Sequence, residues 1–242
     1  PSEIRRMRIQ MGPLASTGVA GSAMIEMGLT SVMASVLGPM EQPRWSDARS
    51  DRAVVSVTVR NAPFASADRR VTNPSSDRRL VEQANLVQKA LEGTLLLHLH
   101  PRSKIEIDLT ILSNDGGALC ACINASTVAL IDAGIPMVDM LSSCSAGLSD
   151  DKDIVLVDLS REEMRTAGGE TAVYLPCAVL PQRGTVVLAQ CESRMPASSF
   201  HKVLQAAIEG CEAVFQVMQA AVRERGSILL SAKSGRGSIM TE

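Results

Sequence analysis

Two short stretches of the chain have residue types and spacing that suit anion binding. In the first, Arg78 and Arg79 directly follow Asp77, at the predicted start of a helix. Cations in the first turn oppose the helix dipole, so on stability grounds they are misplaced there. An anion bound at that helix end, beside free backbone N–H groups, would account for both arginines. The alternative is a salt bridge from these arginines to Asp77 or another carboxylate.

The second stretch is Gly116-Gly117, which lies between a predicted strand and a predicted helix. Glycines at such a junction allow backbone N–H groups to approach an anion closely, at the positive end of the helix dipole. Two glycines also suit a tight strand-to-helix turn that binds nothing. Spacing alone favours the tight turn.

A third candidate is a long polar loop, residues 61–76, with the sequence NAPFASADRRVTNPSS. It contains Arg69 and Arg70, and it is bounded by Arg60 and by Arg78-Arg79. Loops longer than about 12 residues inside compact domains are usually functional or disordered. These arginines therefore either contact a polyanion or are simply solvated.

Composition narrows the possible functions. The 242 residues are 45% hydrophobic with a net charge of −2, so any nucleic-acid binding requires a local basic patch. Aromatic residues make up 2% of the chain, which argues against base-stacking platforms. The six cysteines show no C-x-x-C pair and no nearby histidine cluster, which indicates a reduced, intracellular protein without a zinc site. We expect no metal and no cofactor. No apolar run approaches the roughly 18 residues of a membrane span.

The elements that must position these residues follow from hydrophobic periodicity. Residues 101–136 begin with strict alternation, in which Ile105, Ile107, Leu109 and Ile111 share one face of a strand. After Gly117 the apolar spacing changes to three and four, which indicates a helix. Further helices are predicted from Asp77 to about residue 98 and from 197 to about 223. Strands are predicted at residues 4–14, 22–28, 30–37, 53–59, 137–146, 154–159, 172–180 and 185–191.

This order of elements predicts an α+β protein. The first four strands are joined by short turns, which is typical of an antiparallel meander. In each half of the chain strands are followed by a helix. We therefore expect two α+β halves, residues 1–135 and 136–225, and a flexible tail, residues 226–242.

Beyond these patterns, the chain resembles a known family. HPRSKIEIDLTILSNDGGALCACINASTVALIDAGIPM, residues 100–137, resembles the core of the RNase PH family of phosphorolytic 3′→5′ exoribonucleases. The likeness is strongest to the exosome-ring subunit related to the active archaeal one. It extends over nearly the whole chain except the last dozen residues, through PSEIRRMRIQMG, SAMIEMGLTSVMASVLGP, APF, DRR, SAGLSDDKDIVLVDLSREE and AVLP. The family's early D-G-R-R is missing.

The resemblance implies an RNase PH-like fold of two βαβ-type halves, with mixed or antiparallel sheets and packed helices. It also implies a six-membered ring of such subunits, through whose central channel RNA is threaded. Arginines like Arg78 and Arg79 then hold RNA phosphates, and the loop with Arg69 and Arg70 reaches towards the channel. The expected RNA- or phosphate-binding residues are Arg60, Arg69, Arg70, Arg78, Arg79, Gly116 and Gly117.

The chain departs from the family where chemistry takes place. Active members protonate the departing 3′ oxygen with an aspartate after the strand matched here by residues 154–159. The first such slot is Met164, the second falls within residues 170–174, and no aspartate follows Asp158. The family's D-G-G-T-R also changes, because Ala118-Leu119 follows Gly117. We therefore expect no catalytic residue, although Glu163 or Glu170 in the place of the acid is an alternative.

Three hypotheses follow. The leading one is a non-catalytic ring subunit of a eukaryotic RNA exosome, in the nucleus, nucleolus and cytoplasm, that serves RNA processing and decay. Its partners would be single-stranded RNA, other RNase PH-like subunits, cap subunits with RNA-binding domains and a hydrolytic ribonuclease. The alternative is an active phosphate-dependent 3′→5′ exoribonuclease. The third is a ring member that never touches RNA.

Overall fold

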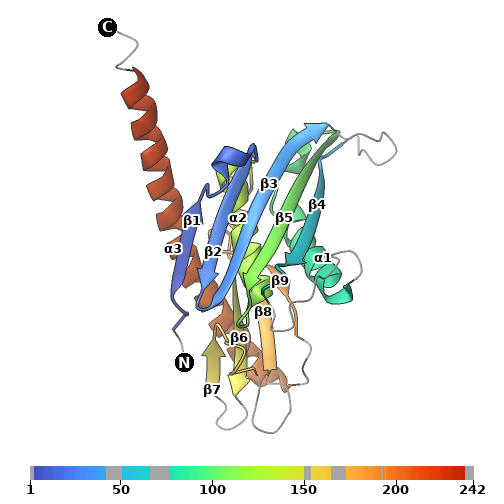
Figure 1. Cartoon of the computed structure of the whole chain (residues 1–242). Coiled ribbons are helices and arrows are strands. Elements are labelled where there is room, and N and C mark those ends of the chain that lie inside the picture. Colours follow the sequence, from blue (N-terminus) through green and yellow to red (C-terminus); the bar gives the residue numbers. More distant parts are fainter. Residues whose placement is uncertain are drawn as a thin grey trace.

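The structure, a computed structural model, describes residues 3–41, 51–65, 77–149, 154–164, 173–191, 193 and 195–237. Two sheets and three α-helices form its layers (Figure 1). The first sheet has the strand order β1-β2-β3-β5-β4. Its strands are β1 (Met7–Met11), β2 (Gly21–Met27), β3 (Thr30–Glu41), β4 (Val54–Asn61) and β5 (Ser103–Ser113).

Strand β5 confirms the predicted alternation. Ile105, Ile107, Leu109 and Ile111 are buried to 1% exposure or less, while Glu106 and the other intervening residues lie on the opposite, half-exposed face. Burial of four branched side chains in one row stabilises this strand as a central element of the sheet.

The expected meander is wrong at its fourth strand. Strands β1, β2 and β3 are antiparallel neighbours, but β5 lies between β3 and β4, and β4 pairs with β5 in parallel. Helix α1 (Arg78–Glu92) connects these two strands. Parallel strands need such a crossover, so β4, α1 and β5 form a βαβ unit.

Helix α2 (Ala118–Asp132) is the element that both sheets share. Residues 118–130 are all buried, because the first sheet packs on one side of the helix and β6 and β8 on the other. A helix that is apolar on every side suits this central position.

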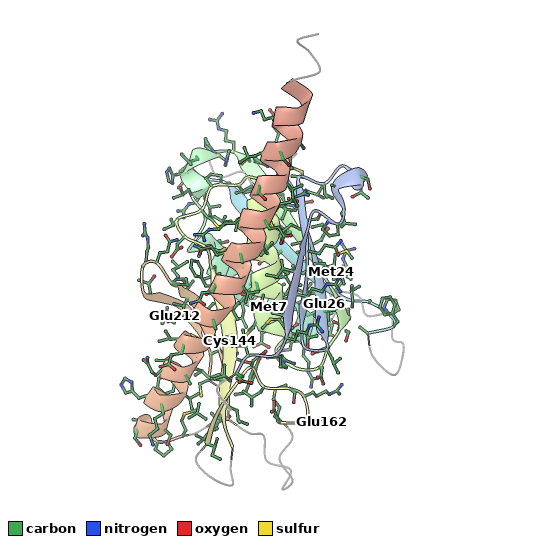
Figure 2. All side chains as sticks on the ribbon, turned by 90° about the vertical axis from the view of Figure 1, so that its left-hand side faces the viewer. Met7, Met24, Glu26, Cys144, Glu162 and Glu212 are labelled. Atoms are coloured by element: carbon green, nitrogen blue, oxygen red, sulfur yellow. The ribbon has the colours of Figure 1, made fainter. Side chains whose placement is uncertain are left out.

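The second sheet has the order β7-β6-β8-β9, and all its neighbours are antiparallel. Helix α3 (Ala197–Gly237) packs across β6 and β8 and along β1. Cys144 of β6 lies beneath it, with its Sγ 2.9 Å from where a Cβ on Gly210 would be (Figure 2). The strands are β6 (Ser142–Ser149), β7 (Ile154–Val157), β8 (Val173–Leu180) and β9 (Thr185–Ala189).

Three predicted boundaries differ most from the structure. Helix α1 ends at Glu92, not near residue 98, because Gly93 follows and the Thr94 hydroxyl donates to Leu91 O over 3.0 Å. Strand β6 begins at Ser142, not at 137, since Asp139 accepts backbone N–H bonds from Met140 and Gln182 in an irregular segment. Helix α3 continues to Gly237, well past residue 223.

One hydrophobic core joins the two predicted halves. A single cluster of buried side chains includes residues from both sheets and all three helices. The boundary near residue 135 stays a prediction. Among the described residues, no helix combines the length and the hydropathy needed to cross a membrane.

Candidate nucleic-acid interface

The first turn of α1 presents two exposed cations. Asp77 is the N-cap, and its Oδ1 accepts a 3.0 Å hydrogen bond from the backbone N–H of Arg79. This bond satisfies one of the free donors at the helix start. The first turn contains no acidic side chain. The Asp77 carboxylate therefore caps the backbone.

Both guanidinium groups at this helix end face solvent. Arg78 and Arg79 are exposed, and neither forms an ion pair within the part of the chain that the structure describes. The salt-bridge alternative from the sequence therefore finds no partner among these residues. Two cations at the positive end of a helix dipole, with no ion pair to any described residue, repel one another and attract anions.

The βαβ unit brings the arginines and the glycine turn to the same end of the first sheet. Strands β4 and β5 are parallel in register, with Asn61 opposite Ile111. Residue 97, which follows α1, accepts a backbone hydrogen bond from Ala53 at the start of β4. Helix α1 thus runs back along the strands, and it begins where β4 and β5 end (Figure 1). Ligands of such sheets bind beyond the carboxyl ends of the strands.

A dense hydrogen-bond network holds the glycine turn. The Thr30 hydroxyl accepts from Asp115 N over 2.9 Å and donates to Gly116 O over 2.7 Å. Asn114 Oδ1 accepts from Gly116 N over 3.1 Å. The N–H of Gly116 is therefore already bonded to protein. Gly117 is the N-cap of α2, in a left-handed conformation and without a side-chain cap.

Protein atoms occupy the space beside both glycines. A Cβ on Gly116 would lie 2.8 Å from Leu159 O and from Met164 Cε. A Cβ on Gly117 would lie 3.0 Å from Arg5 Nη2, and both glycines have positive φ. Packing and backbone conformation account for the two glycines without any anion. That they bind phosphate stays a prediction.

Arg5 and Asp158 form a buried pair behind the turn that the sequence reasoning missed. Asp158 Oδ1 accepts from Arg5 Nη2 over 2.7 Å, and Oδ2 accepts from Arg5 N over 3.1 Å. The guanidinium also donates to the carbonyls of Asp115 and Gly116. Burial is the largest single influence and acts to lower the pKa of Arg5, but the hydrogen bond to Asp158 and the negative charges of Asp158, Asp115 and Glu163 together outweigh it, so that pKa is raised. The two residues are 153 positions apart, so no local pattern could have linked them.

The segment at residues 160–164, which the resemblance matches to the acid position of active members, contacts the glycine turn. Arg161 N donates to Asp115 O over 2.9 Å, and Met164 places a methyl group beside Gly116. Glu163 accepts from Ser160 N over 2.7 Å, while Ser160 Oγ accepts from Glu163 N. This reciprocal pair has the bonding pattern of a capping box on the turn at residues 161–164, so the carboxylate of Glu163 is already engaged. Glu170 lies outside the described residues.

The remaining predicted site residues are placed differently or lie outside the structure. Arg60 is on β4, and its Nη2 is 3.5 Å from Asp108 Oδ1, with both side chains exposed. A surface pair of this kind contributes little to stability and can exchange partners. Arg69 and Arg70 lie outside the described residues.

The cysteines behave as core residues. All six are free thiols, and five are buried. Burial raises the pKa of the Cys120 and Cys122 thiols to about 12. No group of three or more His, Cys, Asp or Glu side chains in the described ranges is placed to hold a metal ion.

Known proteins resemble the chain over almost its full length. The model of the RNase PH family, described as the 3′ exoribonuclease family, domain 1, matches residues 3–136. The human exosome complex component RRP41 is 37% identical over 233 residues, which cover 94% of this chain and 91% of that protein. The archaeal exosome complex component Rrp41 of Thermococcus kodakarensis is 36% identical over 223 residues, which cover 92% of this chain and 86% of that protein. Identity thus does not separate the eukaryotic from the archaeal relatives.

Solved structures share the fold at lower identity. Rice Rrp46 superposes with a TM-score of 0.78 at 20% identity, covering 92% of this chain and 97% of that one. A chain of the Archaeoglobus fulgidus exosome with RNA bound to the active site superposes with a TM-score of 0.71 at 24% identity, and the match covers 89% of each chain. Both agree with the observed α+β architecture of two sheets around α2. The chain belongs to the RNase PH family of 3′ exoribonucleases.

Proposed function

We propose that this protein is an RNase PH-like ring subunit of an RNA exosome. It binds single-stranded RNA through phosphate contacts and has lost its own phosphorolytic activity. Its relatives named as exosome components from an animal and an archaeon support the exosome role. Cap subunits, a hydrolytic nuclease and residence in nucleus, nucleolus and cytoplasm belong to the same proposal.

One observation supports RNA binding above all others. Arg78 and Arg79 are exposed, form no ion pair among the described residues, and lie at a helix N-terminus beyond the carboxyl ends of β4 and β5. Two cations with free N–H donors beside them suit a chain of phosphates. Contacts to phosphate are weakly dependent on sequence and strongly dependent on salt.

The loss of activity is supported by the surroundings of the glycine turn. Met164 lies where active members are expected to hold an acid, and its methyl group fills the space beside Gly116. Two nearby carboxylates are engaged, Asp158 with Arg5 and Glu163 with Ser160. Loss of a general acid lowers the rate by about 10²–10⁴-fold.

The test uses the reconstituted ring, without hydrolytic nucleases, and a 3′-labelled single-stranded RNA. We expect salt-sensitive binding and no release of nucleoside diphosphate, with or without inorganic phosphate. The Arg78→Ala/Arg79→Ala variant should bind roughly tenfold more weakly, and the log–log salt slope should fall by about 1.4. Arg183→Ala, in the exposed β8–β9 turn, is the matched control and should change neither quantity.

Two results would overturn parts of the proposal. Phosphate-dependent release of nucleoside diphosphate that Arg78→Ala/Arg79→Ala abolishes would establish an active exoribonuclease. RNA crosslinking that is unchanged in the double variant would show that this helix end does not contact RNA.

A further inference from the structure

An aromatic ring is exposed where β4 ends. Phe64 follows the strand after a short turn and is 67% exposed. The other aromatic side chains in the described ranges, Tyr174, Phe200 and Phe215, are each at least partly buried. The low aromatic content argues against a stacking platform of several rings, but the fold leaves this one ring at the surface.

The backbone around Phe64 holds the ring in a defined position. Ala62 N donates to Ile111 O over 2.9 Å, which continues the pairing of β4 with β5 past the last residue of the strand. Ala65 N then donates to Ala62 O over 2.8 Å and closes a β-turn with Pro63 at its second position. Proline presets the backbone conformation at that position. Phe64, at the third position, is therefore preorganised, and little backbone entropy is lost when the ring meets a partner.

This turn lies at the same end of the first sheet as Arg78 and Arg79. Strands β4 and β5 end there, and α1 begins beside the end of β4 (Figure 1). Both arginines are exposed, and neither forms an ion pair with a described residue. Of the acidic side chains near this helix end, Asp77 caps the backbone, and Glu82 lies a turn further along α1 without an ion pair to either arginine. The surface beyond β4 thus combines one exposed aromatic ring with two cations.

This combination favours a single-stranded nucleic acid over a folded protein. A protein that covered Phe64 would also desolvate the two cations nearby, which is costly unless a carboxylate meets each of them. RNA meets both requirements with one repeating unit, because each nucleotide carries an aromatic base and a phosphate. Proteins that bind single strands combine cations that follow the backbone with aromatic side chains on which the bases stack.

We propose that Phe64 stacks on a base of the single-stranded RNA whose phosphates Arg78 and Arg79 bind. The inference rests on the proposed function, which supplies the RNA, and it adds a contact to the base that phosphate binding alone lacks. Every base has a π-face, so this contact tolerates any sequence. It distinguishes RNA that carries bases from the bare sugar–phosphate backbone.

The experiment measures the fluorescence anisotropy of two labelled oligonucleotides of equal length on the reconstituted ring, without hydrolytic nucleases. One is single-stranded RNA, and the other has the same backbone with abasic sites. Phe64→Ala should weaken binding of the RNA at least fivefold, because stacking on one base contributes about 5–150-fold in affinity. The abasic oligonucleotide should bind wild type and Phe64→Ala equally. The log–log salt slope for the RNA should stay unchanged, since the substitution removes no charge.

Three further variants separate stacking from other effects. Phe64→Tyr keeps an aromatic ring and should bind RNA like wild type. Phe64→Leu keeps an apolar side chain without a π-face and should weaken binding nearly as much as Phe64→Ala. Leu99→Ala is the matched control, because Leu99 is 52% exposed in the short 3₁₀ helix Leu97–Leu99, near the start of β4, and its loss should leave RNA binding unchanged. Thermal unfolding of Phe64→Ala should match wild type, since the ring is exposed in the folded chain.

Three results would overturn the inference. Equal RNA affinity of Phe64→Ala and wild type, or full retention of binding by Phe64→Leu, shows that the ring does not stack on a base. Failure of Phe64→Ala, but not of Leu99→Ala, to enter the ring assigns Phe64 to a contact with another protein instead. A wild-type ring that binds no RNA removes the proposed function and the inference together, whereas salt-sensitive binding that Phe64→Ala leaves intact refutes the stacking alone.

Discussion

The buried pair of Arg5 and Asp158 offers a direct test of how the glycine turn is held. The Asp158 side chain is 0% exposed and that of Arg5 is 18% exposed, so each charge replaces much of the water that would otherwise solvate the other. Removal of one member of a buried pair typically costs about 3–5 kcal/mol, since the other charge stays buried. The backbone N–H of residue 5 still bonds to Asp158 in Arg5→Ala. We therefore expect Arg5→Ala to lower the free energy of unfolding by an amount near the lower limit of this range, about 3 kcal/mol.

The assay is a double-mutant cycle in urea with Arg5→Ala, Asp158→Asn and the double variant. Asparagine removes the buried charge, so the double variant should be less destabilised than the sum of the single variants, with a coupling of about 2 kcal/mol. Arg60 and Asp108 form the control cycle, because their side chains are 55% and 36% exposed. Exposed pairs couple by less than about 1 kcal/mol. Equal coupling in the two cycles would refute the reasoning.

Three further predictions concern the core and the glycines. The pKa of the Cys120 and Cys122 thiols rises from 9.0 to about 12 on burial, so their contribution to stability is complete below pH 9 and is lost as the pH rises towards 12. At pH 10 each buried thiol therefore lowers the free energy of unfolding by about 1.4 kcal/mol relative to neutral pH. In urea titrations, Cys122→Ala should lose less stability between pH 8 and pH 10 than the wild type does. An equal loss in the two proteins would contradict this prediction. Gly21→Ala should destabilise the protein by about 3 kcal/mol or more in the same urea titration, because its Cβ would lie 2.3 Å from Ala133 N. A Cβ on Gly226 would meet no other atom within 4 Å, so Gly226→Ala should stabilise the helix and slow amide hydrogen exchange near residue 226 by about fivefold. Unchanged exchange would show that helix propensity at residue 226 does not control local opening of α3.

Much of the local structure could be predicted because it depends on short-range periodicity. Alternation in 103–113 and three–four spacing after Gly117 gave β5 and α2 within a few residues. The start of α1 was predicted at Asp77, where residue type alone allows either Ser76 or Asp77 as the N-cap and the structure has Asp77. Errors occurred at element ends, where a side-chain hydrogen bond such as that of Thr94 decides the boundary.

The candidate site also contains residues that local sequence patterns predict and residues that only the tertiary fold reveals. The exposed pair Arg78-Arg79 was predicted because it breaks a local rule of helix electrostatics. Arg5 could not be found, since its partner Asp158 is reached only through the tertiary fold. The role of Gly116 was left open by the sequence, and the tertiary structure adds that Leu159 O and the methyl group of Met164 pack beside it.

The amino-acid sequence by itself determined the α+β class, the central strand and helix, the family resemblance and the absence of aspartate after Asp158. These properties depend on residue type and on spacing within one or two turns. The tertiary structure decided that β5 lies between β3 and β4 and that Arg5 pairs with Asp158 behind the glycine turn. It also decided that the last turns of α3 extend beyond both sheets. Each of these requires contacts between residues far apart in the chain, whose energies no local pattern encodes.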